Sequence, residues 1–201
     1  MGIEFEYPVG ATPLDPDEAA GLVPDHITNQ GQLNRWELGN VLRGEKWAFA
    51  RKRTNLLSRE FILALHKRMF GDTWRWAGEL RTTEKNIGVP PEAIEVEIRK
   101  LCEDLAAQLK DRSWPIDEIA ARFHHRLVYI HPFPNGNGRF ARTMTDLLLV
   151  RQGSERFSWG AGDLASDTSE VRKRYISALQ AADGRSYSEL FSFVRLTQTA
   201  G

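Results

Sequence analysis

Residues 131–142 read His131-Pro132-Phe133-Pro134-Asn135-Gly136-Asn137-Gly138-Arg139-Phe140-Ala141-Arg142. Pro132 and Pro134 oppose continuation of the helical pattern before them, because a residue that precedes proline is pushed out of the α region. Gly136 and Gly138 allow positive φ and let the backbone approach a ligand closely. Since an amphipathic pattern follows, the Gly-Asn-Gly turn is predicted to lie at the N-terminus of a helix.

This turn has the composition of a phosphate site. The unpaired N–H groups at a helix N-terminus and the positive end of its dipole favour anions. Arg139 and Arg142 are three residues apart and share one face of the helix, and the planar guanidinium group suits phosphate oxygens. His131 stands at the lip of the turn, with an ordinary pKa of about 6.5 that suits a general base. We therefore expect a phosphate cradle of backbone amides, an Asn amide and two guanidinium groups.

Outside this stretch the sequence is mostly helical in pattern. Apolar residues recur at intervals of three and four in segments that begin near residues 28, 58, 91, 115, 138, 169 and 186. Gly44 is expected to end the first of these helices, and Ser58 to cap the second. Leu80, Arg81, Thr82 and Thr83 are compatible with a strand, and the turn chemistry after them predicts a short β-hairpin flap. The fold class is therefore all-α with one small hairpin.

The amino-acid composition excludes several classes of protein. The chain has 201 residues, with 27 Lys and Arg against 27 Asp and Glu, so the formal net charge is zero. A neutral chain argues against a broad electrostatic surface for nucleic acid or an anionic membrane. Arg51-Lys52-Arg53 is interpreted as a solvated surface, with nucleic-acid contact as the alternative. A single cysteine and no apolar stretch near 18 residues favour a cytoplasmic protein without a membrane span.

The stretch 131–142 resembles the signature of the Fic (filamentation induced by cAMP) family, His-x-Phe-x-(Asp/Glu)-Gly-Asn-Gly-Arg-x-x-Arg. The resemblance extends to Phe70-Gly71-Asp72 and to Trp76-Ala77-Gly78, and it covers roughly residues 50–197. It predicts a Fic domain at residues 50–201, preceded by an N-terminal arm and short helix at residues 1–49. The arm and Thr28-Asn29-Gln30-Gly31 resemble the subgroup labelled mobile mystery protein B, which is encoded beside a helix-turn-helix partner.

Membership of the family implies a helical core with a hairpin flap and the transfer of AMP from ATP to a protein Ser, Thr or Tyr hydroxyl. His131 would be the general base, and Phe133 would anchor the loop. The resemblance assigns the α-phosphate to Gly136, Asn137 and Gly138, the β-phosphate to Arg139 and the γ-phosphate to Arg142. The flap residues Leu80, Arg81, Thr82 and Thr83 would dock an extended segment of the target protein.

One position departs from the family pattern. Asn135 stands where Asp or Glu would bind Mg²⁺, and an amide oxygen brings no charge to the metal. This departure keeps alternatives open: transfer of phosphate, UMP or a phosphocholine-type group, or a nucleotide-binding regulatory module that works in a toxin–antitoxin-like pair. Many Fic proteins also carry an inhibitory helix whose Glu pairs with the second motif arginine. Here Gln32 stands at the matching position and Glu37 is the nearest carboxylate, so an inhibitory helix and a simple packing helix both remain open.

Overall fold

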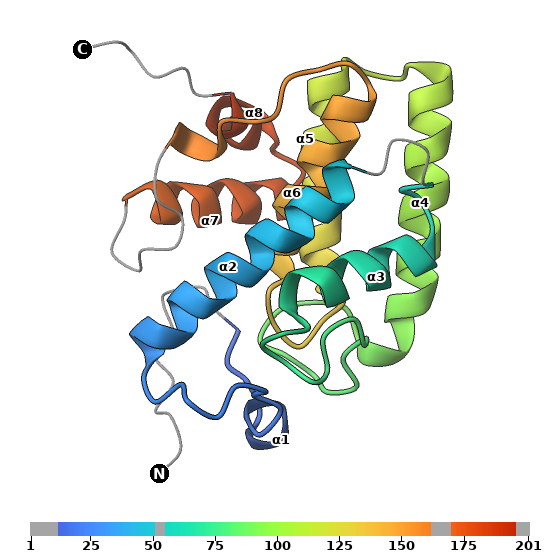
Figure 1. Cartoon of the computed structure of the whole chain (residues 1–201). Coiled ribbons are helices and arrows are strands. Elements are labelled where there is room, and N and C mark those ends of the chain that lie inside the picture. The colour runs from blue at the N-terminus through green and yellow to red at the C-terminus, as the bar shows by residue number, and fades with distance from the viewer. Residues whose placement is uncertain (1–11, 51–54, 162–169, 196–201) are drawn as a thin grey trace, which may run out of the picture.

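The computed structural model describes residues 12–50, 55–161 and 170–195 (Figure 1). Arg51-Lys52-Arg53 and the first 11 residues of the arm lie outside these ranges. The α-helices are α1 (Pro16–Ala19), α2 (Gln30–Phe49), α3 (Arg59–Phe70), α4 (Ile94–Asp111), α5 (Ile116–Ile130), α6 (Asn137–Arg151), α7 (Glu170–Asp183) and α8 (Ser188–Val194). Two 3₁₀ turns, η1 (Pro91–Ala93) and η2 (Trp159–Ala161), complete the regular structure. No helix in these ranges is long and apolar enough to cross a membrane.

Helices α5 and α6 form the centre of the molecule and are joined by residues 131–136. Helix α4 packs against α5 on one side, while α2 and α3 pack as a pair that also contacts α6. Figure 1 shows α2 crossing in front of α6, and α7 and α8 beside the centre. The fully buried side chains at the junction of α5 and α6 include Leu127, Ile130, Phe133 and Phe140. The motif loop therefore grows directly out of the apolar core.

Local chemistry explains where the helices begin. Ser58 caps α3, as predicted, by accepting a hydrogen bond from the Phe61 N–H at 3.2 Å. Asn29 caps α2 in the same way through the Gln32 N–H at 3.0 Å. Pro115 is the N-cap residue of α5, with φ −53° and ψ 146°, so it lies just before the first turn and not in it as predicted.

The prediction that Gly44 ends the first helix is wrong. Helix α2 continues through Gly44 to Phe49. A Cβ at Gly44 would lie 2.6 Å from the Met69 side chain and 2.8 Å from its backbone, so glycine lets α2 and α3 approach closely. Gly44 is therefore a packing residue between two helices.

The predicted hairpin at residues 78–88 does not form a β-ladder, and no strand occurs in the ranges that the structure describes. The backbone of this segment pairs instead with the end of α5, where the Val89 N–H donates to the Ile130 carbonyl at 3.4 Å, and with the loop after it, where the Arg81 N–H donates to the Pro132 carbonyl at 3.0 Å. The Arg81 guanidinium group donates to the carbonyl oxygens of His131, at 2.7 Å, and of Thr83 and Val89. Because this buried side chain satisfies the carbonyl groups that a partner strand would bind, the segment remains an irregular loop.

Candidate active site

Two left-handed residues shape the motif loop. His131 ends α5 with φ 52° and ψ 60°, and Gly136 precedes α6 with φ 79° and ψ 0°. A Cβ on Gly136 would lie 2.5 Å from the ring of Phe70, so both the backbone angle and the packing require glycine there. The chain thus turns sharply at both ends of the loop that joins α5 to α6.

Asn137 holds this loop closed. Its side chain is buried, and it accepts from the Phe133 N–H at 2.9 Å and donates to the Phe133 carbonyl at 2.8 Å. The amide group is therefore engaged within the protein on both sides. The structure gives the Asn137 side chain a role in shaping the loop, which leaves its backbone N–H, at the start of α6, to face a ligand.

His66 on α3 supports the loop from beneath, and the sequence pattern gave no sign of this role. Its ring stacks on Phe133 with centroids 3.7 Å apart and planes at 15°. Nδ1 accepts from the Gly78 N–H at 3.0 Å, so Nε2 carries the hydrogen and donates to the Asn135 carbonyl at 3.1 Å. Burial lowers the pKa of His66 to about 3, so this tautomer is kept at neutral pH.

The two motif arginines differ in their partners. Arg139 forms an ion pair with Glu37 of α2, Nη1 to Oε2 at 2.6 Å, and its guanidinium group lies over the Phe70 ring. The other Glu37 oxygen accepts from Trp74 Nε1 at 2.7 Å. Glu37 thus contacts the first motif arginine, whereas the family's inhibitory carboxylate is expected at the second.

Arg142 is half-buried like Arg139, and it lies beside Tyr175 of α7. Its guanidinium carbon is 5.8 Å from the centroid of the Tyr175 ring. Burial, followed by the positive charges of Arg139 and Arg172, lowers the pKa of Arg142. Within the described ranges no carboxylate forms an ion pair with it. The three guanidinium groups together make this side of α6 electrostatically suited to a polyanion.

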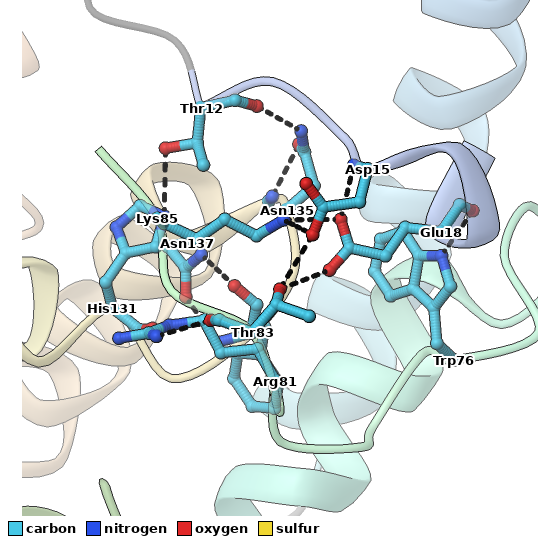
Figure 2. Close-up of polar contacts among 12 residues, drawn as sticks. Thr12, Asp15, Glu18, Trp76, Arg81, Thr83, Lys85, His131, Asn135 and Asn137 are labelled. Atoms are coloured by element: carbon cyan, nitrogen blue, oxygen red, sulfur yellow. Dashed lines mark hydrogen bonds and ion pairs between the residues drawn. The ribbon is translucent and has the colours of Figure 1, made fainter. Parts of the chain in front are cut away.

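His131 is buried, with 5% of its surface exposed, and it contacts the N-terminal arm. Its Nε2 lies 3.1 Å from the hydroxyl oxygen of Thr12 (Figure 2). Burial, with smaller contributions from the positive charges of Arg81 and Lys85, lowers the pKa of His131 to about 4. The imidazole is therefore neutral at physiological pH and able to accept a proton.

Asn135 also contacts the arm, and its surroundings fit a metal poorly. Its Nδ2 donates to the Thr12 carbonyl at 3.2 Å, while its Oδ1 accepts from the Gly136 N–H at 2.6 Å. The described residues contain no cluster of three or more His, Cys, Asp or Glu that could hold a metal ion. One amide oxygen that already accepts a hydrogen bond is a weak donor set for Mg²⁺, which usually takes one or two carboxylates besides phosphate oxygens.

The four residues predicted to dock a target protein, Leu80 to Thr83, differ in how far their side chains are buried. Arg81 is 3% exposed, and its side chain is not available to a target protein. Thr82 and Thr83 are exposed, and Leu80 is half-buried. Leu80 packs against the apolar core, so Thr82 and Thr83 are the exposed members of the four, and docking of a target on this loop stays a prediction.

Residues 56–149 match the sequence model of the Fic/DOC family. This segment, a little under half of the chain, is a Fic/DOC-family sequence. The protein adenylyltransferase fic-1 of Caenorhabditis briggsae is 39% identical over 103 residues, which cover 48% of this chain and 20% of the relative. The protein adenylyltransferase Fic of Nematostella vectensis is 37% identical over 97 residues, or 46% of this chain and 22% of the relative. The match therefore spans about a fifth of the length of these curated relatives.

Solved structures share the fold over most of the chain. The N-terminal Fic domain of Bep8 from Bartonella sp. 1-1C superposes with a TM-score of 0.67 over 88% of this chain and 91% of that one, at 17% identity. Fic-1 (residues 134–508) from C. elegans superposes with a TM-score of 0.62 at 26% identity, covering 87% of this chain and 51% of that one. The Fic fold thus extends beyond the segment that the family model matches, to include most of the helices in Figure 1.

Proposed function

We propose that this chain transfers AMP from ATP to a protein hydroxyl group, with residues 50–201 as the catalytic domain and residues 1–49 controlling access to it. The observation that carries the proposal is that one short loop joins His131, at the end of α5, to the N-terminus of α6, whose first turns carry Arg139 and Arg142. The family relationship supports it, because the curated relatives that match this segment are protein adenylyltransferases. A neutral base beside a cationic helix start is the arrangement that attack of a hydroxyl group on a phosphate needs.

In the proposed step His131 Nε2 takes the proton of the acceptor hydroxyl as its oxygen attacks the α-phosphorus of ATP. The bond from the α-phosphorus to the oxygen that bridges to the β-phosphate breaks, and pyrophosphate leaves with that electron pair. The N–H groups at the start of α6 face the α-phosphate, Arg139 the β-phosphate and Arg142 the γ-phosphate. ATP enters as its Mg²⁺ complex, in which the phosphate oxygens hold the metal.

Gly138 supports the placement of phosphate at this point. A Cβ there would make only ordinary contacts, with Arg142 Nη1 at 3.6 Å and the Tyr175 hydroxyl at 4.0 Å. Unlike Gly136, it has no positive φ that would require glycine. Packing within the protein therefore does not explain the missing side chain, whereas close approach of a phosphate to the helix backbone does.

A nucleotide-binding regulatory module is the second candidate, and a specific observation favours it. Thr12 contacts His131 and Glu37 pairs with Arg139, so the base and one arginine both have partners within the chain. A module without turnover would use the same cradle for binding alone. Transfer of phosphate, UMP or a phosphocholine-type group would keep the site and change the donor.

Labelled ATP distinguishes these functions. The chain and its Glu37→Gln variant are incubated in a cell lysate with ATP labelled at the α- or the γ-phosphate. AMP transfer labels protein from the α position only, and phosphate transfer labels it from the γ position only. No label from either, together with tight ATP binding, identifies the module, and label from UTP or CDP-choline identifies the other donors.

The location and the partner are also proposals. A cytoplasmic location rests on the amino-acid composition, and a helix-turn-helix partner in a toxin–antitoxin-like pair rests on the resemblance of the arm to its subgroup. Co-expression of the chain with a helix-turn-helix protein encoded beside it tests the partner. Copurification in a fixed ratio supports the pair, and separation of the two proteins counts against it.

A further inference from the structure

The N-terminal arm brings its own hydroxyl group to the candidate base. Thr12 is buried, and its Oγ1 lies 3.1 Å from His131 Nε2. A general base must lie within about 2.6–3.2 Å of the proton donor that it serves. When the neutral ring carries its hydrogen on Nδ1, Nε2 accepts the hydrogen bond from the Thr12 hydroxyl. This threonine therefore occupies the place that the proposed function gives to an acceptor hydroxyl.

The backbone of Thr12 is held as well as its side chain. Its carbonyl oxygen accepts from Asn135 Nδ2 at 3.2 Å, so the two ends of the loop 131–135 contact one residue of the arm. A carboxylate at position 135 could not donate this hydrogen bond and would repel the carbonyl oxygen. The amide that departs from the family pattern is thus explained by its contact with the arm.

The arm also rests on the loop that was predicted to dock a target. Figure 2 shows Lys85 reaching between Asp15 and Glu18, with Nζ to oxygen distances of 2.8 and 2.6 Å. The Lys85 side chain is only 3% exposed. Thr83 adds a hydrogen bond from its hydroxyl to Asp15 at 2.8 Å. These hydrogen bonds lower the pKa of Asp15, Lys85 contributing most and Thr83 next, so the carboxylate stays charged at neutral pH.

Further contacts fix the path of the arm after α1. Trp76 Nε1 donates to the Glu18 carbonyl at 2.9 Å. Leu22 forms an antiparallel bridge with Trp74, in which the Arg75 N–H donates to the Gly21 carbonyl at 2.9 Å. The register of the arm is therefore set by both backbone and side-chain contacts, and Thr12 is placed at His131 by a fixed path.

We propose that Thr12 is a cis acceptor, which the chain modifies with AMP at its own active site. The proposal rests on the proposed function above. The Thr12 O–H bond breaks and its proton passes to His131 Nε2, while Oγ1 forms a bond to the α-phosphorus. The bond between the α-phosphorus and the bridging oxygen breaks, and pyrophosphate leaves. Because Thr12 is already in position, the reaction is intramolecular and gains the effective concentration of a bound substrate.

The test maps the modified residue in the full chain. Wild type and the Glu37→Gln variant are incubated with α-labelled ATP, and the modified peptide is identified by mass spectrometry. We expect AMP on Thr12, at a first-order rate that does not change with protein concentration. Thr12→Val should lose this label, and Thr12→Ser, which restores a hydroxyl group, should keep it. Ser113→Ala, which removes an exposed hydroxyl group between α4 and α5, is the control and should label as wild type does.

A mixing experiment separates cis from trans transfer. A His131→Ala chain keeps Thr12 but has no base, and it is mixed with a Thr12→Val chain that keeps the base. Label on Thr12 of the His131→Ala chain would overturn the cis proposal. Label on lysate proteins with none on Thr12 would overturn the acceptor and leave the proposed function standing. No label on any protein in wild type or in Glu37→Gln would overturn both.

Discussion

At the scale of single residues, the pKa of His131 depends more on burial than on any neighbouring charge. An exposed histidine titrates near pH 6.5, whereas burial lowers the pKa of His131 to about 4. Its sequence position predicted a base at the lip of a phosphate site, but the pattern could not show that the arm would cover the ring. A base with a lowered pKa stays neutral, and so stays active, further into acid.

The pH profile of transfer tests this consequence. His131 can act as a base only when its ring is neutral. Activity is therefore lost as the pH falls through its pKa, which burial has lowered. We expect the acid limb of kcat/KM for AMP transfer to fall well below pH 6.5, towards about 4. The initial rate is measured across a pH series in buffers of constant ionic strength. An acid limb at or above 6.5 would show that the working base is exposed or is another group.

A second prediction concerns Asn137. Its side chain either holds the loop in shape or binds phosphate, and the two roles predict different effects of a substitution. Asn137→Ala removes both hydrogen bonds to Phe133 and leaves the buried N–H and C=O of Phe133 without partners. We expect the free energy of unfolding to fall by about 1–3 kcal/mol, measured by urea denaturation without nucleotide. Asn86→Ala, on the surface of the neighbouring loop, is the control. If Asn137→Ala leaves the free energy of unfolding unchanged and weakens ATP binding, the Asn137 side chain binds phosphate and does not hold the loop.

At the scale of elements, the amphipathic patterns predicted the helices well and the flap badly. Ser58 was correctly expected to cap α3, and the pattern after Gly136 correctly predicted α6. Gly44 was misread because a glycine required by helix packing looks, in sequence, like a glycine that ends a helix. The flap was misread because Arg81 makes contacts with carbonyl groups of the distant segment 130–131, which no local pattern shows.

Helix α2 gives the prediction at this scale. Its Glu37 holds Arg139, the proposed β-phosphate ligand, in an ion pair. Glu37→Gln removes the charge and keeps an oxygen that can accept the hydrogen bond from Trp74. We expect tighter ATP binding and AMP transfer faster by about tenfold, since about 1.4 kcal/mol of competing interaction is a factor of ten. ATP affinity by calorimetry and the initial rate of transfer are compared with those of Glu45→Gln on the same helix. An unchanged rate and affinity would make α2 a packing helix only.

At the scale of the whole molecule, the N-terminal arm and the motif loop form one site. The sequence supplied the loop and its chemistry, because the residues of the motif are contiguous. It could not supply the contacts that join Thr12 to His131, or His66 to Asn135, because these pairs are 119 and 69 residues apart. The division into residues 1–49 and 50–201 stays a prediction, and the contacts of the arm describe how the two parts meet.

The role of His131 in transfer is tested most directly by one measurement. Initial rates of AMP transfer from α-labelled ATP to lysate proteins are compared for wild type and His131→Ala, with ATP affinity measured on the same preparations. We predict that His131→Ala lowers the rate by about 10²–10⁴-fold, because it removes the base, and leaves the affinity nearly unchanged, because the phosphates are held by α6 and the arginines. A His131→Ala rate within a few-fold of wild type would contradict the assignment of His131 as the base.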